Sequence, residues 1–136
     1  MNRLALFLVA LVLSLITGCA ARPSEYELNY LGSALTKLSA SVDATARYKR
    51  AADGLSEDQL LRASTDHDPE LLKPFDGYTI RVMRSGRDSA VLICQAGGGN
   101  ALLEDIGCTA RMDVHRWRQN SPLCEFTLDV QATCAR

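Results

Sequence analysis

The amino-acid sequence predicts an α+β domain in which N-terminal helices are followed by a small antiparallel β-sheet stapled by disulfides. Two observations support this class. Apolar residues recur at helical spacing up to residue 74 and at the alternating spacing of strands after residue 78. Four cysteines, enough for two disulfides, are confined to the last third of the chain. Within the 136 residues we expect one domain over 24–136, helical over 24–74 and mainly β over 78–134.

The composition excludes several classes of protein. The 15 Lys and Arg residues nearly balance the 16 Asp and Glu residues, so the chain lacks the positive excess of a dedicated nucleic-acid-binding protein. Hydrophobic residues make up 47% of the chain, and the apolar N-terminus inflates this fraction. The rest has an ordinary globular composition, which excludes a mainly disordered chain and a membrane protein with several spans.

The N-terminus has the parts of an export signal. Arg3 precedes an apolar run over 4–13, which is too short for a comfortable transmembrane helix. The run leads into the sequence Ile16-Thr17-Gly18-Cys19. These four residues resemble the lipobox of bacterial lipoprotein precursors, in which an aliphatic residue and two small residues precede an obligatory cysteine. The resemblance covers only about the first nineteen residues.

The resemblance implies that residues 1–18 are a signal peptide and that Cys19 carries the lipid, with 19–23 as a short tether. Several acyl chains make an essentially permanent membrane anchor. Lipoproteins with Asp after this cysteine tend to stay in the inner membrane. Ala20 stands here, which favours the inner leaflet of the outer membrane, facing the periplasm. The alternatives are the inner membrane, the cell surface, a secretory signal cut near Ala20 and an uncleaved anchor.

The remaining cysteines are Cys94, Cys108, Cys124 and Cys134. An exported chain enters an oxidising compartment, so two disulfides are expected. Intervals of 13, 15 and 9 residues match no C-x-x-C redox or zinc arrangement. All three pairings remain open, and the pairs of chain neighbours, Cys94–Cys108 and Cys124–Cys134, are preferred.

A long helix is expected from Glu25 to about Ala52. Ser24 and Glu27 have the spacing of a capping box, which satisfies free amide groups at a helix start. An apolar stripe follows at alternating steps of three and four residues. We expect this face to pack on the domain itself, with a partner helix as the alternative. The stripe consists of Leu28, Leu31, Leu35, Leu38 and Val42.

Two shorter helices are expected before the sheet. Ser56 and Gln59 form a second capping box. Asp68 and Pro69 suit the N-cap and first position of a third helix, which should end at Pro74.

The region after residue 77 is expected to be mainly β. Alternation over 78–84, a turn at 85–88 and apolar residues over 89–95 predict a β-hairpin. Another turn at 97–100 leads to 101–106, which is either a strand or a short helix, and 109–117 is likewise ambiguous. Alternating Phe126, Leu128 and Val130 predict a final strand over 123–130.

Signatures of catalysis are scarce, so we expect no catalytic residue, no metal and no cofactor. The glycines at 97–99 lack the lysine and spacing of a phosphate-binding loop. His67 lies between two aspartates and His115 lies near Asp113. A small metal-assisted or acid–base enzyme that uses one of these histidines is the alternative function.

Binding in the cell envelope is the preferred function. Arginines gather in the sheet half, and Trp and Arg are enriched at binding hot spots. The alternative interpretation is that these arginines are solvated and protect sheet edges. We expect membrane attachment through the lipid, and an envelope protein or anionic envelope polymer as the partner, with no nucleic acid. The candidate interaction residues are Arg81, Arg84, Arg87, Arg116, Trp117 and Arg118.

Overall fold

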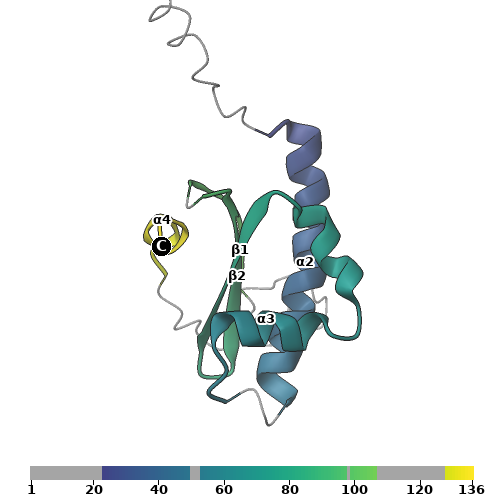
Figure 1. Cartoon of the computed structure of the whole chain (residues 1–136), viewed down its shortest axis with the longest axis vertical. Helices are drawn as coiled ribbons and strands as arrows, with labels where there is room; N and C mark the ends of the chain where they lie inside the picture. Colours follow the sequence, from purple (N-terminus) through teal and green to yellow (C-terminus); the bar gives the residue numbers. More distant parts are fainter. Residues whose placement is uncertain (1–22, 50–52, 98, 107–127) are drawn as a thin grey trace, which may run out of the picture.

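The computed structural model describes residues 23–49, 53–97, 99–106 and 128–136 (Figure 1). Helices precede a three-stranded antiparallel sheet, so the predicted α+β class is confirmed. The helices before the sheet are α2 (Glu25–Tyr48), α3 (Glu57–Thr65) and the 3-10 helix η2 (Pro69–Phe75). The strands are β1 (Tyr78–Ser85), β2 (Asp88–Gln95) and β3 (Ala101–Ile106), and the short helix α4 (Val130–Cys134) follows.

Helix α2 begins where the sequence predicts, but its cap differs from the prediction. The Ser24 hydroxyl accepts a hydrogen bond from the Glu27 amide at 3.2 Å. The Glu27 carboxylate accepts one from the Tyr78 hydroxyl at 2.6 Å, so it joins α2 to β1 rather than closing a capping box. This hydrogen bond also raises the pKa of Tyr78 above its ordinary value. The first turn of α2 is thereby fixed to the sheet.

Helix α2 ends at Tyr48, earlier than the predicted end near Ala52. Lys49 leaves the helical conformation, with φ −83° and ψ 115°. Its ammonium group donates to the carbonyl oxygen of Ala63 at 2.8 Å. The chain therefore leaves α2 at the point where a side chain reaches across to α3.

The two short helices confirm their predicted starts. Ser56 and Gln59 form both hydrogen bonds of the capping box. The Asp68 carboxylate accepts from the Glu70 amide at 3.2 Å, and Pro69 occupies the first turn of η2. Pro74 lies inside η2, which continues to Phe75 and buries that ring in the core.

Replacing Ser56 with alanine is expected to lower the free energy of unfolding by about 1 kcal/mol, because the Gln59 amide loses its acceptor. Chemical denaturation would measure this loss. Ser33→Ala is the matched control, since the Ser33 hydroxyl donates only to the Asn29 carbonyl within α2 and contributes little there. Equal losses for the two variants would contradict the assigned cap.

The sheet has the order β1-β2-β3, and both neighbouring pairs are antiparallel. The predicted hairpin is confirmed, with Ser85 opposite Asp88. Gly86 has φ 60° as the first residue of the two-residue turn, where a type II′ turn needs a positive φ. The ambiguous segment 101–106 is a strand, β3, which pairs with β2 through Leu103 opposite Ile93.

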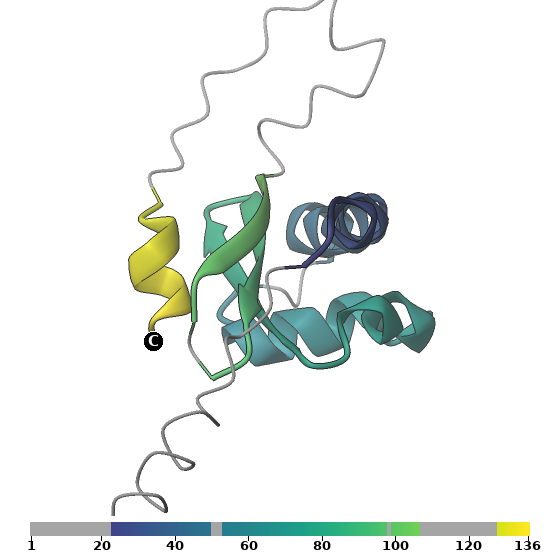
Figure 2. The same ribbon diagram turned by 90° about the horizontal axis from the view of Figure 1, so that it is seen from above.

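Strand β2 is buried on both faces because helices cover both sides of the sheet (Figure 2). Val91 and Ile93 belong to the larger core, together with Val82 and the α2 stripe. Ala90, Leu92 and Cys94 belong to a smaller core on the other face, which α4 covers. The α2 residues in the larger core are Leu31, Leu35, Leu38 and Val42.

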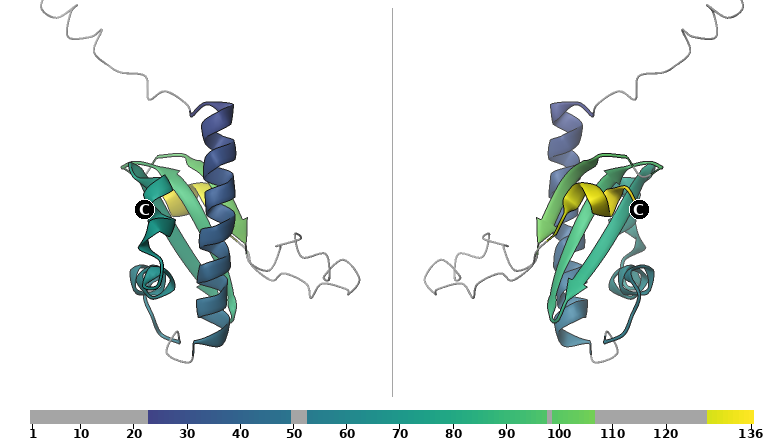
Figure 3. Two further views of the ribbon diagram at one scale, coloured as in Figure 1. Left: turned by 90° about the vertical axis from the view of Figure 1, so that its right-hand side faces the viewer. Right: turned by 90° about the vertical axis from the view of Figure 1, so that its left-hand side faces the viewer.

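The apolar stripe of α2 therefore packs on its own domain, as expected. Figure 3 shows α2 lying across the sheet, with its first turns projecting past the strands. Among the described residues, no helix combines the length and apolar character needed to cross a membrane.

The predicted final strand is wrong over the part that the structure describes. Leu128 and Asp129 lie in no strand, and Val130 begins α4. The Asp129 carboxylate accepts from the Ala132 amide at 2.9 Å, which caps the helix. Leu128 and Val130 still pack on the smaller core, so their apolar character serves a helix rather than a strand. Residues 123–127 lie outside the described residues.

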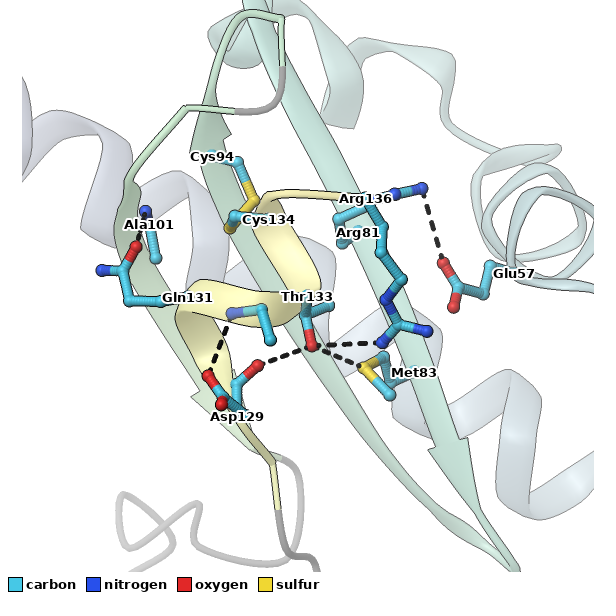
Figure 4. The surroundings of a disulfide bond; sticks show 11 residues. Glu57, Arg81, Met83, Cys94, Ala101, Asp129, Gln131, Thr133, Cys134 and Arg136 are labelled. Atoms are coloured by element: carbon cyan, nitrogen blue, oxygen red, sulfur yellow. Dashed lines mark hydrogen bonds and ion pairs between the residues drawn. A yellow bond between two sulfur atoms is a disulfide. The ribbon is translucent and has the colours of Figure 1, made fainter.

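One disulfide joins the sheet to α4, and it is the pair Cys94–Cys134 (Figure 4). The preferred pairing of chain neighbours is therefore wrong. Cys94 faces the smaller core, where α4 brings Cys134 to a Cα–Cα distance of 5.6 Å. The pairing thus follows from the face of β2 on which Cys94 lies. Cys108 and Cys124 lie outside the described residues.

Candidate functional site

An open groove of about 270 Å³ lies between the first half of α2 and η2. Its α2 wall carries side chains spaced so that they share one face of the helix. Its other wall is η2, which is fixed by the Asp68 cap and the buried Phe75 ring. The groove is lined by residues that include Tyr30, Ser33 and Lys37 from α2, and Glu70, Leu71 and Pro74 from η2.

The groove combines apolar walls with charged groups. Leu71 and Pro74 are half-buried and supply apolar surface. Glu70 is paired with Lys73, 2.7 Å between the carboxylate oxygen and the ammonium nitrogen. Lys37 is exposed and has neither a hydrogen bond nor an ion pair within the described parts of the chain. The groove therefore offers an ammonium group beside an apolar surface.

Two of the predicted interaction arginines hold the domain together. Arg84 donates to the Asp53 carboxylate at 2.6 Å and to the Ala46 carbonyl at 3.3 Å, and only 19% of its side chain is exposed. Arg81 lies 3.9 Å from the Glu57 carboxylate, and its Nε is buried with no hydrogen-bond partner within the described ranges. Both arginines therefore join β1 to the segment that contains α3.

The other candidate arginines lie elsewhere. Arg87 is exposed in the β1–β2 turn. Residues Arg116, Trp117 and Arg118 lie outside the described residues. The structure thus brings Arg81, Arg84 and Arg87 to one strand and its turn, and of these three only Arg87 is exposed.

A second ionic cluster joins α2 to the sheet. The Arg47 guanidinium donates from Nε to Asp43 at 2.8 Å and from Nη2 to Asp88 at 2.6 Å. The hydrogen bond to Asp43 raises the pKa of Arg47 above its ordinary value. Since Asp88 begins β2, the cluster connects the hairpin to the last turns of α2.

Asp105 is a partly buried carboxyl group that lies close to a second carboxyl group, that of Asp43. It lies on β3, half-buried, and faces α2. Burial raises the pKa of Asp105, the nearby Asp43 carboxylate raises it further, and a hydrogen bond with Ser39 opposes the shift. Two acidic groups and a buried hydroxyl therefore meet between β3 and α2.

Asp105→Asn is expected to make the protein more stable at neutral pH, because the variant no longer buries a charge. The raised pKa means that the folded state binds the Asp105 proton more tightly than the unfolded state does. The stability that this proton contributes is therefore fully present below the ordinary pKa and is lost as the pH rises through the raised one. Urea unfolding at several pH values would measure the difference. A gap between variant and parent that widens on acidification would contradict this assignment.

The histidine alternative gains no support from the described geometry. His67 is exposed between α3 and η2, and the neighbouring Asp68 carboxylate is used as the η2 cap. His115 lies outside the described residues. Within the described ranges, no three His, Cys, Asp or Glu side chains gather closely enough to hold a metal ion.

No protein-family model, curated protein or solved structure matches the chain.

The groove was not predicted from the sequence. Its α2 wall lies beside the apolar stripe, and its other wall depends on how η2 folds back on α2. One signal was present. Tyr30, which lines the groove, lies off the apolar stripe, where a large aromatic side chain is not needed for the core.

Proposed function

We propose that this protein is a lipoprotein of the bacterial cell envelope, which faces the periplasm and acts by binding another envelope protein. It would serve as an accessory subunit, an inhibitor or a sensor. The observation that carries the binding part is the α2–η2 groove, with exposed Lys37 beside the apolar Leu71 and Pro74. An open site with apolar walls and a few polar groups is typical of recognition surfaces.

The membrane and compartment parts of the proposal come from cysteine chemistry. Cys19 ends a sequence that resembles a lipobox. The Cys94–Cys134 bridge suits a protein exported to an oxidising compartment, because disulfides are rare in reducing cytosol. The lipobox-like sequence and the disulfide therefore independently support export of the protein from the cytosol.

A protein partner is favoured over an anionic polymer. A polymer of that kind would need several available cations, and Arg81 and Arg84 already lie against Glu57 and Asp53. The groove instead suits a protein segment that places an apolar side chain near Leu71 and a carboxylate near Lys37. Such a segment would combine apolar burial with one charge pair.

The anchor is tested by Cys19→Ser in the full precursor, produced in a bacterium that processes lipoproteins. This variant is expected to lose acyl labelling and to leave the membrane fraction, because the thiol that carries the lipid is gone. Ala20→Asp is the control, since it keeps Cys19 and should stay acylated while moving to the inner membrane. Acyl labelling that persists in Cys19→Ser, or is absent from the parent protein, would overturn the proposed anchor.

The groove is tested by placing a photo-crosslinking amino acid at one of three exposed positions in the native envelope. Ser33 reports on the groove, Arg87 on the hairpin turn and Ala132 on α4. We expect a protein adduct from Ser33 alone, and we expect Lys37→Glu to abolish it by reversing the charge. An adduct from Arg87 alone would show that the partner binds at the hairpin turn and not in the groove. The absence of adducts from all three positions would contradict protein binding.

A further inference from the structure

We propose that the N-terminal end of α2 rests on the bilayer surface, with Tyr26 among the lipid headgroups. The occupant of this helix face is the membrane to which the chain itself is attached. The inference rests on the proposed anchor at Cys19 and adds an orientation of the folded domain on the membrane.

Two of the three exposed large hydrophobic side chains among the described residues lie near the N-terminal end of α2. Tyr26 is 83% exposed and Tyr30 is 56% exposed. Tyr30 lies four residues after Tyr26 on the same face of α2 and lines the groove, so Tyr26 is the exposed ring nearest the proposed anchor. Tyrosine suits the boundary of a membrane, because its ring is apolar while its hydroxyl group can remain hydrated.

The chain length between the anchor and Tyr26 keeps this ring near the lipid. Tyr26 follows Cys19 by only seven residues, so even a fully extended chain would span at most about 25 Å. The first turns of α2 also project past the sheet, as Figures 1 and 3 show. This end of the helix can therefore meet a flat surface before the rest of the domain does.

The charges near Tyr26 indicate the kind of contact. Glu25 and Glu27 lie in the first turn of α2, and the Glu27 carboxylate is held by the Tyr78 hydroxyl. These acidic groups do not favour anionic headgroups. The contact is therefore aromatic and should form on zwitterionic lipid with little dependence on salt.

Tryptophan fluorescence in the lipidated protein tests this orientation. The single native tryptophan is first removed by Trp117→Phe, and then Tyr26→Trp and Tyr48→Trp are made separately. Tyr48 is the matched control, because it is 82% exposed but lies about 33 Å farther along α2 at about 1.5 Å per residue. Each protein is reconstituted into phosphatidylethanolamine–phosphatidylcholine vesicles that contain headgroup spin-labelled lipid.

We expect the spin label to reduce Tyr26→Trp emission about twofold, at low and high salt alike, and to leave Tyr48→Trp emission unchanged. Equal quenching at both positions, no quenching at Tyr26→Trp, or loss of its quenching in salt would each overturn the orientation. Mass spectrometry of the same samples separates the two proposals. An acylated protein without quenching overturns the orientation alone, whereas a protein without acyl chains overturns the anchor and this inference together. Because Tyr26 and Tyr48 are both exposed, their replacement by tryptophan should leave the fold unchanged, and circular dichroism verifies this.

Discussion

Replacing Cys94 and Cys134 together with alanine is expected to lower the free energy of unfolding by about 4 kcal/mol. The bridge joins residues separated by 40 positions, so its removal increases the conformational entropy of the unfolded chain. Both side chains are fully buried in the smaller core, and alanine fits there without adding volume. A loss of this size is a large share of the stability of a small domain.

Urea unfolding of the purified oxidised protein and of the double variant would measure this effect. The oxidised parent treated with a reductant is the companion measurement and should lose at least as much stability as the variant. Peptide mapping without reductant should recover Cys94 linked to Cys134. A double variant within about 1 kcal/mol of the parent would contradict the importance of this bridge.

Leu38→Ala is expected to destabilise the protein by about 2–5 kcal/mol. Leu38 has no exposed surface and lies in the centre of the α2 stripe, among residues of the larger core. Truncation removes buried apolar contacts and leaves a cavity between α2 and the sheet.

The matched control is Lys37→Ala, one position earlier on α2 but exposed in the groove. It should change the free energy of unfolding by no more than about 0.5 kcal/mol. If Lys37→Ala keeps the stability of the parent protein, a loss of binding in this variant cannot be attributed to unfolding. Similar losses for the two variants would contradict the assignment of Leu38 to the core.

Local signals in the sequence predicted much of the first half of the fold. Ser56 and Asp68 cap their helices as predicted, because a cap depends on residues only two or three positions away. Gly86 supplies the positive φ of the hairpin turn. The leucine stripe of α2 also packed as expected, since its spacing fixes one apolar face.

Features that depend on distant contacts were not predictable in the same way. Alternation around Leu128 resembles a strand, yet the Asp129 cap and the packing of Val130 on the smaller core produce a helix. The partner of Cys94 depends on which face of β2 the residue occupies and on where α4 docks. The groove exists only because η2 returns to α2, which no short sequence pattern records.

The arginines of β1 have a consequence for self-association. Strand β1 is at one end of the strand order, where a bare edge invites a strand from another copy. Here α3 packs against β1, and Arg81 and Arg84 hold acidic groups of the preceding segment beside it. Under the proposed lipid anchor, copies of this chain would diffuse in two dimensions and meet often. The charged side chains on β1 would then oppose pairing of this strand with a strand of another copy.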